Sequence, residues 1–246
     1  EYIDGGSYAE ETLRRNVADL QALSLRQRVM RDMSELDMSV TSLGQTFAMP
    51  LGLGPVGMSG MFGRRGEAQA ARAAAQAGVP FCLSTVGVCT IEEVARTGTA
   101  PWFQLYMLKD RGFMRDLIGG AKAAGCPVLV FTVDLPIPGA RYRDVRSGFT
   151  GATGLSGALN TAWDGLTHPG WMWDVWANGR PHVLGSVAPA VATSQKVTDY
   201  LGWIAKNFDR SVTWADLDWV RQIWDGPIVI KGVLDPDDAR DRKSDV

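Results

Sequence analysis

The sequence predicts an α/β protein built as a (β/α) barrel. Short apolar segments alternate with helix-forming segments over much of the chain, a pattern that predicts parallel strands joined by right-handed crossovers. Polar side chains follow several of these strands rather than one, which is typical of a barrel. An open doubly wound sheet would concentrate them at a single switch point, so we favour the barrel over that alternative.

Composition indicates a folded globular protein and excludes several functions. Hydrophobic residues make up 46% of the 246 positions, far more than in disordered chains. The formal net charge is −2, so the chain lacks the basic excess that nucleic-acid binding requires. Cys82, Cys89 and Cys126 show no metal-ligand spacing, and we expect buried thiols and no metal site.

The N-terminal part of the chain holds a Gly-rich turn and the first alternating elements. The turn covers 2–7, and a helix over 10–23 follows it, with acidic residues at the start of the helix. A short apolar run bounded by Pro predicts the first strand over 49–55. An Ala-rich segment predicts a helix over 66–77, and the second strand is predicted over 79–84.

The middle of the chain continues this alternation. Residues 90–95 predict a short helix, because a hydroxyl residue followed three positions later by Glu forms a capping-box pattern. The third strand is predicted over 102–106, a helix over 110–124 and the fourth strand over 126–134. The fourth segment is apolar on both faces, as a buried parallel strand requires.

The alternation is interrupted after the fourth strand by an excursion over 147–210 that is rich in Gly, Thr and Trp. Loops of this length are usually functional. We expect a helix over 194–208 and a second one over 214–224, capped by the Thr before it. The fifth strand, over 226–231, ends in a Lys, and a further helix follows it.

Seven motifs occur in order along the chain. They are Tyr-Ile-Asp-Gly-Gly-Ser, Gly-Pro-Val-Gly-Met, Leu-Ser-Thr, Phe-Gln-Leu-Tyr, Thr-Val-Asp, Gly-Ala-Arg-Tyr-Arg-Asp and Val-Ile-Lys-Gly-Val. Together they closely resemble the FMN-dependent L-2-hydroxyacid dehydrogenase and oxidase family, from residue 2 to about residue 240. Within that family the chain is most similar to the bacterial respiratory L-lactate dehydrogenases.

The resemblance implies a (β/α)8 TIM barrel, of which this chain holds about the first five β/α units. Residues 1–246 would form a partial barrel, with 147–210 inserted after the fourth strand. The family's general-base His follows the fifth strand in a Ser-Asn-His-Gly-Gly-Arg context that this sequence lacks. We therefore expect a fragment without that base, since His168 and His182 both lie in the excursion.

The resemblance also implies FMN as the cofactor. The residues expected to bind it are Pro55, Val56, Gly57, Ser84, Gln104, Thr132 and Lys231. A Gly lets the backbone approach the flavin closely, and the three polar side chains would bind the edge of its ring. The positive charge of Lys231 would stabilise the anionic reduced flavin.

Substrate and catalytic groups are implied in the same way. A 2-hydroxy acid carries a carboxylate, which Arg141 could bind through two parallel hydrogen bonds. Tyr2 and Tyr106 match the family's other substrate groups. The expected catalytic side chains are Lys231, Asp134 and Tyr106, of which Asp134 would orient the catalytic His.

The expected activity is oxidation of L-lactate to pyruvate, with electrons passed through FMN to a quinone or another respiratory acceptor. No Gly-x-Gly-x-x-Gly follows a strand, which argues against a dinucleotide enzyme. Two alternatives stay open: mandelate or another L-2-hydroxy acid as substrate, and a catalytically dead fragment. Met58, Val86 and Met107 would bear on the substrate. Relatives in the family suggest a homo-oligomer for the intact protein.

Four Trp residues gather in the excursion among few charges. They are Trp163, Trp171, Trp173 and Trp176. Trp favours the membrane interface, where its ring is apolar and its N–H stays hydrated. We expect peripheral attachment to the cytoplasmic face of the plasma membrane. The alternative is a lid or an oligomer contact that buries the same side chains.

Overall fold

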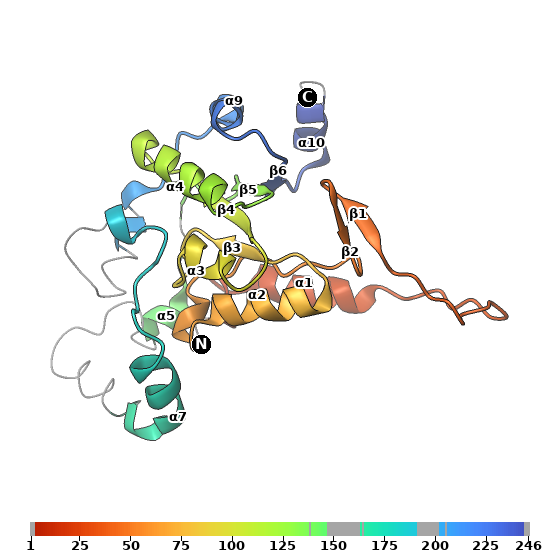
Figure 1. The fold of residues 1–246 in the computed structure, drawn as a ribbon, viewed down its shortest axis with the longest axis horizontal. Helices are drawn as coiled ribbons and strands as arrows, with labels where there is room; N and C mark the ends of the chain where they lie inside the picture. The colour runs from red at the N-terminus through yellow and green to blue at the C-terminus, as the bar shows by residue number, and fades with distance from the viewer. Residues whose placement is uncertain are drawn as a thin grey trace. The chain divides into compact units, whose positions relative to one another are not determined.

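The computed structural model describes residues 3–137, 139–146, 163, 165–190, 202–204 and 206–243. The chain divides into two compact units, whose helices and strands are labelled in Figure 1. The first consists of Glu1–Met38 and Pro138–Thr167, and the second of Ser39–Ile137 and His168–Val246. Each unit is described by itself.

The first unit contains α1 (Glu11–Ala22) and α5 (Tyr142–Arg146). The predicted helix over 10–23 is confirmed to within a residue at each end. The backbone N–H of Tyr8 donates to the carbonyl of Ala140 at 2.7 Å, which joins the N-terminal segment to the segment before α5. The rings of Tyr8 and Tyr142 meet edge to face, with 6.0 Å between their centroids.

A β-hairpin that was not among the elements predicted from the sequence begins the second unit. It pairs β1 (Val40–Ser42) with β2 (Gln45–Phe47) in antiparallel register. The two turn residues, Leu43 and Gly44, have φ values of +51° and +74°. Positive φ at both central positions marks a type I′ turn, whose twist matches that of the flanking strands.

The main sheet of the second unit is parallel and has four strands. These are β3 (Cys82–Ser84), β4 (Trp102–Tyr106), β5 (Leu129–Thr132) and β6 (Ile228–Lys231), in the spatial order β3-β4-β5-β6. Each strand therefore lies beside its neighbour in the sequence. A doubly wound sheet reverses its strand order at a switch point, whereas a barrel does not. The sheet is a partial barrel, as predicted.

The predicted first strand over 49–55 is shorter than expected. Within it, Leu53 forms a single parallel bridge to Phe81, immediately before β3. The N–H of Leu53 donates to the carbonyl of Pro80 and its own carbonyl accepts from Cys82, each at 2.9 Å. Proline has no N–H to donate, and the Pro residues that bound this segment confine its pairing to the centre. The segment still continues the parallel order at the β3 edge.

The helices of the second unit lie where the sequence places them. The structure has α2 (Gly66–Ala77), α3 (Ile91–Ala95), α4 (Arg111–Ala123), α9 (Trp214–Ile223) and α10 (Pro236–Lys243). Thr90 caps α3, because its Oγ1 accepts from the N–H of Glu93 at 3.1 Å. The second half of the expected capping box is replaced, since the Glu93 carboxylate pairs with Arg65.

Short helical segments make up the described part of the excursion. They are α7 (Pro169–Trp171), a π-helix η2 (Met172–Ala177) and a 3₁₀ helix η3 (Ala188–Ala190), while the 3₁₀ helix η1 (Ser59–Met61) precedes α2. Of the helix predicted over 194–208, residues 202–204 and 206–207 are helical. The rest of that prediction lies outside the described residues.

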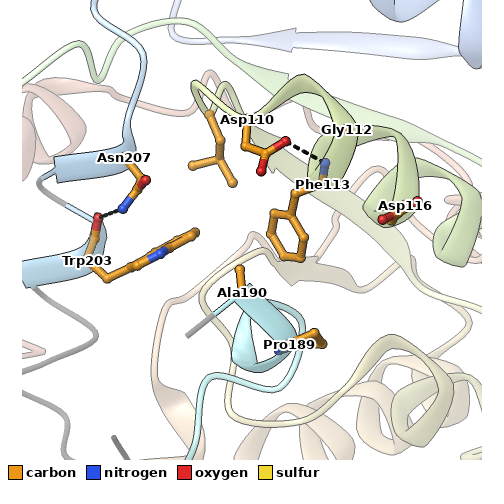
Figure 2. A pocket seen from close by; sticks show the side chains of 9 residues that line it. Asp110, Gly112, Phe113, Asp116, Pro189, Ala190, Trp203 and Asn207 are labelled. Carbon is orange, nitrogen blue, oxygen red and sulfur yellow. Dashed lines mark hydrogen bonds between the residues drawn. The ribbon is translucent and has the colours of Figure 1, made fainter. Parts of the chain in front are cut away.

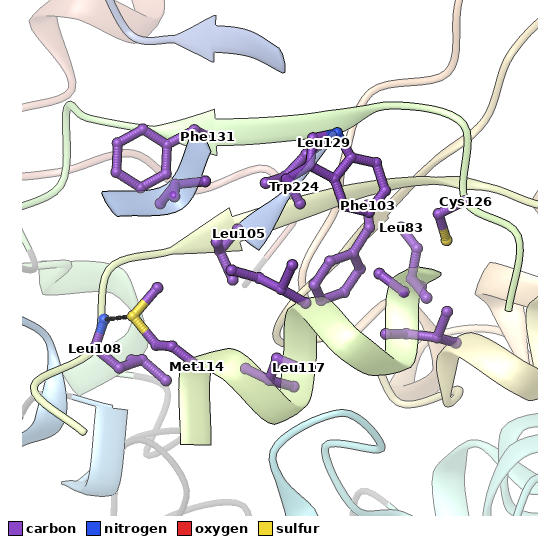
Figure 3. Packing of buried hydrophobic residues seen from close by; sticks show 14 of the residues in the cluster. Leu83, Phe103, Leu105, Leu108, Met114, Leu117, Cys126, Leu129, Phe131 and Trp224 are labelled. Carbon is purple, nitrogen blue, oxygen red and sulfur yellow. Dashed lines mark hydrogen bonds between the residues drawn. The ribbon is translucent and has the colours of Figure 1, made fainter. Parts of the chain in front are cut away.

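The core lies between the sheet and α4 and α9. Phe103 and Leu105 of β4 face Met114 and Leu117 of α4, and all four are nearly or fully buried (Figure 3). Cys82, Cys89 and Cys126 are free, buried thiols, as predicted. Burial raises the pKa of both Cys82 and Cys126 to about 12. Within the described ranges, no cluster of His, Cys, Asp and Glu could hold a metal ion.

An arginine joins α4 to the start of α9. Nη2 of Arg111 donates to Asp209 at 2.6 Å and to Asp216 at 2.9 Å. Hydrogen bonds from Ser211, together with the Arg111 guanidinium, hold the pKa of Asp209 below its ordinary value of 3.8, against the opposing effect of burial. The Asp209 side chain is only 11% exposed. The charge of this carboxylate therefore stabilises the packing of the two helices.

We expect Asp209→Asn to lower the free energy of unfolding at pH 7 by about 1–2 kcal/mol. A carboxylate with a lowered folded-state pKa stabilises the fold above its unfolded pKa, and that stabilisation is lost as the pH falls through the folded-state value. In denaturant titrations the difference between variant and wild type should therefore shrink as the pH falls below 3.8. Asp225→Asn, at a side chain that is 85% exposed, is the matched control and should change little. A difference that persists at low pH would contradict a charge effect.

Candidate functional site

Three buried polar side chains form a continuous hydrogen-bonded row across β3, β4 and β5. Ser84 Oγ donates to Gln104 Oε1 at 3.1 Å, and Gln104 Nε2 donates to Thr132 Oγ1 at 2.8 Å. Each of the three residues is at most 5% exposed. Burying an amide and two hydroxyls is costly unless they bond to one another. The sequence predicted these residues individually, and the structure brings them together.

The Lys at the end of β6 stands beside this row. Thr132 and Lys231 are register partners on β5 and β6. Lys231 Nζ lies 3.7 Å from Asp134 Oδ1, and these side chains are 42% and 40% exposed. An ion pair at this separation and exposure is weak. The ammonium therefore keeps much of its hydrogen-bonding capacity at the carboxyl edge of the sheet.

Tyr106 ends β4 at the same edge and is register partner to Thr132. Its ring packs on Phe208, with 4.8 Å between the centroids and a 32° interplanar angle. The backbone N–H of Tyr106 donates to Thr85 Oγ1 at 3.4 Å. Thr85 is 1% exposed, and the sequence analysis did not single it out as a site residue, although it follows Ser84 in the Leu-Ser-Thr motif.

The segment Pro55–Gly57 follows the Leu53 bridge and leads into η1. Val56 is 51% exposed. A Cβ on Gly57 would lie 2.8 Å from Cγ2 of Val86, so glycine is required here for packing between two loops. The N–H of Met58 donates to the carbonyl of Val86 at 2.9 Å, which fixes this segment to the loop after β3.

Two predicted substrate groups are not part of the second unit. Tyr2 lies outside the described residues. Arg141 belongs to the first unit, where its Nε lies 2.7 Å from Oδ2 of Asp144. Asp144 is 2% exposed, so the arginine is anchored by a buried carboxylate.

A cavity in the described part of the chain lies elsewhere. It has a volume of about 530 Å³ and lies beside the start of α4, with Phe113 and Asp116 on one side and Trp203 and Asn207 on the other (Figure 2). A second cavity of about 380 Å³ adjoins β2 and α2. None of the predicted site residues lines either cavity. We therefore place the candidate site at the open carboxyl edge of the sheet.

A model of the FMN-dependent dehydrogenase family matches residues 1–243. The chain belongs to this family. It is 58% identical over 241 residues to an L-lactate dehydrogenase of Ectopseudomonas mendocina (strain ymp). The aligned region covers 98% of this chain and 63% of that protein. The chain thus spans less than two thirds of that relative's length.

Solved structures of the family resemble the fold closely. A crystal structure of the monotopic membrane protein (S)-mandelate dehydrogenase superposes with a TM-score of 0.86 at 29% identity, over 99% of this chain and 64% of that one. A mandelate oxidase with (S)-4-hydroxymandelic acid gives a TM-score of 0.78 at 32% identity, over 99% and 61%. These neighbours confirm the partial-barrel architecture.

The residues at the carboxyl edge fit FMN, the cofactor of the family. The flavin ring offers carbonyl oxygens and unprotonated ring nitrogens, which accept hydrogen bonds, and a ring N–H, which donates one. An amide nitrogen carries two hydrogens, and Gln104 Nε2 uses one of them for Thr132. Lys231 adds an ammonium that is 42% exposed. The edge therefore combines donors with a positive charge.

Gly232 follows Lys231 and packs closely against the side chain of Asp134. Its φ is +108°, and a Cβ there would lie 2.4 Å from Cβ of Asp134. We expect Gly232→Ala to lower the free energy of unfolding by about 1–3 kcal/mol through backbone strain, and by more where the clash is not relieved. Chemical denaturation measures the change. Gly119→Ala is the control, since a Cβ at this α4 position meets nothing within 4 Å and should be neutral or stabilising. Equal stability of Gly232→Ala and wild type would contradict the strain.

Proposed function

We propose that this chain forms the FMN-binding strand ends of an enzyme that oxidises L-lactate to pyruvate. The observation that carries the proposal is the buried row of Ser84, Gln104 and Thr132 beside Lys231. The 58% identity to an L-lactate dehydrogenase supports lactate as the substrate. When bound, FMN supplies an acceptor for the two electrons removed from the hydroxy acid.

The proposed roles of the residues follow from their chemistry. Gln104 and its two hydrogen-bonded neighbours hold the flavin edge, and the backbone of Pro55–Gly57 lies against the ring. Lys231 stabilises negative charge with its ammonium, which the weak pairing with Asp134 leaves available. Because the donors are fixed by buried hydrogen bonds, they need little rearrangement during the reaction.

The substrate would be bound by Arg141, Tyr2 and Tyr106. A guanidinium can hold a carboxylate through two parallel hydrogen bonds, and Asp144 fixes Nε of Arg141 at 2.7 Å. Tyr106 contributes a phenolic hydroxyl near the carboxyl edge of β4. Asp134 would orient the general base. Neither His168 nor His182 is assigned as that base.

Mandelate or another L-2-hydroxy acid is the second candidate substrate. The TM-score of 0.86 with (S)-mandelate dehydrogenase favours it. Met58, Val86 and Met107 are the side chains proposed to select between a methyl and a phenyl substituent. A catalytically inactive chain that still binds FMN is the remaining alternative.

Titration of FMN with the purified chain tests the proposal. We expect quenching of flavin fluorescence by the wild type and at least about tenfold weaker binding by Lys231→Met, which removes the charge and keeps the apolar stem. Lys122→Met is the control, because Lys122 lies on α4 and pairs with the exposed carboxylate of Asp225, which follows α9. Bleaching of the bound flavin by L-lactate but not by (S)-mandelate would identify the substrate. Absence of flavin binding by the wild type would overturn the proposal, and binding without bleaching by either acid would indicate the inactive chain.

We further propose that the enzyme is a homo-oligomer that attaches peripherally to the cytoplasmic face of the plasma membrane and passes its electrons to a quinone. No helix in the described part of the chain is long and apolar enough to cross a bilayer. Trp173 is 73% exposed on η2, and Trp171 and Trp176 are 41% and 45% exposed. Trp163, in the first unit, is 67% exposed. Within the second unit, three exposed Trp residues on α7 and η2 fit a bilayer interface.

A triple variant in which Trp171, Trp173 and Trp176 are each replaced by Gln should no longer co-sediment with liposomes. Apolar rings inserted at the interface are replaced by side chains that stay in water. Trp219→Gln on α9, outside the excursion, is the control. Equal sedimentation of the triple variant and wild type would favour the lid or oligomer alternative, and size-exclusion chromatography of both proteins would distinguish these two.

A further inference from the structure

A buried carboxylate, which is not itself among the proposed FMN contacts, joins two loops. Each of these loops carries residues that are proposed to contact FMN. Glu67 is the second residue of α2, and its side chain is buried, with the residue 1% exposed. Its Oε1 accepts from the N–H of Gly60 at 3.1 Å and from the N–H of Val88 at 2.8 Å. One oxygen atom therefore bonds two loop segments that are far apart in the sequence.

Both segments lead directly to residues of the candidate site. Gly60 lies three positions after Gly57, and Val88 lies four positions after Ser84. The Met58 N–H to Val86 carbonyl bond, at 2.9 Å, is a further link between the same loops. A change in the separation of these loops would move the Pro55–Gly57 backbone relative to the polar row.

The packing around the carboxylate requires glycine. A Cβ on Gly60 would lie 2.8 Å from Oε2 of Glu67 and 2.7 Å from Cβ of Val88. Oε2 accepts no hydrogen bond from the described residues. A buried carboxylate is costly unless hydrogen bonds and nearby positive charge compensate for lost hydration. Here the two backbone donors contribute, together with the electrostatic attraction of the Arg65 guanidinium.

We infer that Glu67 is a positioning residue, which sets the spacing of the two loops that hold FMN. The inference rests on the proposed function. Without the carboxylate, the N–H groups of Gly60 and Val88 lose a charged acceptor inside the protein. The loops then separate or rotate to reach water, and the Gly57 backbone loses its fixed relation to Ser84 and Gln104.

Glu67→Ala and Glu67→Gln test this in the full chain. Each charge-assisted hydrogen bond is worth about tenfold in an equilibrium, so we expect the Ala variant to bind FMN at least tenfold more weakly than wild type. The Gln variant keeps one carbonyl oxygen as acceptor and should recover most of that affinity. Glu92→Ala, at an exposed position on α3, is the control and should bind like wild type.

Two further measurements separate positioning from general stabilisation. Amide hydrogen exchange without FMN should be faster at Gly60 and Val88 in Glu67→Ala, and the visible absorption bands of FMN at saturation should differ from those of wild type. A lower melting temperature with unchanged affinity and spectrum would overturn the inference. If the Ala variant does not fold, amide exchange in Glu67→Gln decides. Exchange at Gly60 and Val88 that is faster than in wild type is expected, because an amide oxygen is a weaker acceptor than a carboxylate, and unchanged exchange overturns the inference. If wild type binds no FMN, the proposed function fails with it, whereas binding by wild type and Glu67→Ala alike defeats this inference alone.

Discussion

The parallel register of β3 to β6 is the constraint on which the candidate site depends. It sets Ser84 opposite Gln104 and Thr132 opposite Lys231, so polar side chains from four strands end at one edge. Gln104 then bridges its neighbours, because its amide both accepts and donates. A slip of one residue in any strand would turn these groups to the other face and break the row.

The loops at this edge are held by backbone contacts that only small residues permit. Gly57 packs against Val86, and Gly232 packs against Asp134. Glu67 adds a buried acceptor between two loops. Close backbone approach and buried hydrogen bonds limit the motion of the donors, which is the condition for electrostatic stabilisation without reorganisation. Packing of the strands against α4 in the hydrophobic core holds the strands that carry this arrangement.

Local signals in the sequence predicted the helices well and the short strands less well. The Ala-rich composition of α2, the capping pattern of α3 and the helix-forming segment of α4 predicted these helices, and the observed ends agree to within a residue. The hairpin β1–β2 was missed because each strand has three residues and the turn lacks the usual Asn-Gly or Asp-Gly signal. The strand predicted over 49–55 reduces to the Leu53 bridge, because proline limits its pairing.

The sequence by itself determined the fold class, the family resemblance and the residues that carry the proposed chemistry, because residue type and order along the chain are sufficient for these. Tertiary structure decided the sequential order of the strands, which separates the barrel from an open sheet. It also decided that Glu93 pairs with Arg65 instead of closing its capping box, and that Glu67 joins two loops. These contacts link residues far apart in the chain, and the partner of a buried polar group depends on which segments the packed core brings within hydrogen-bonding distance.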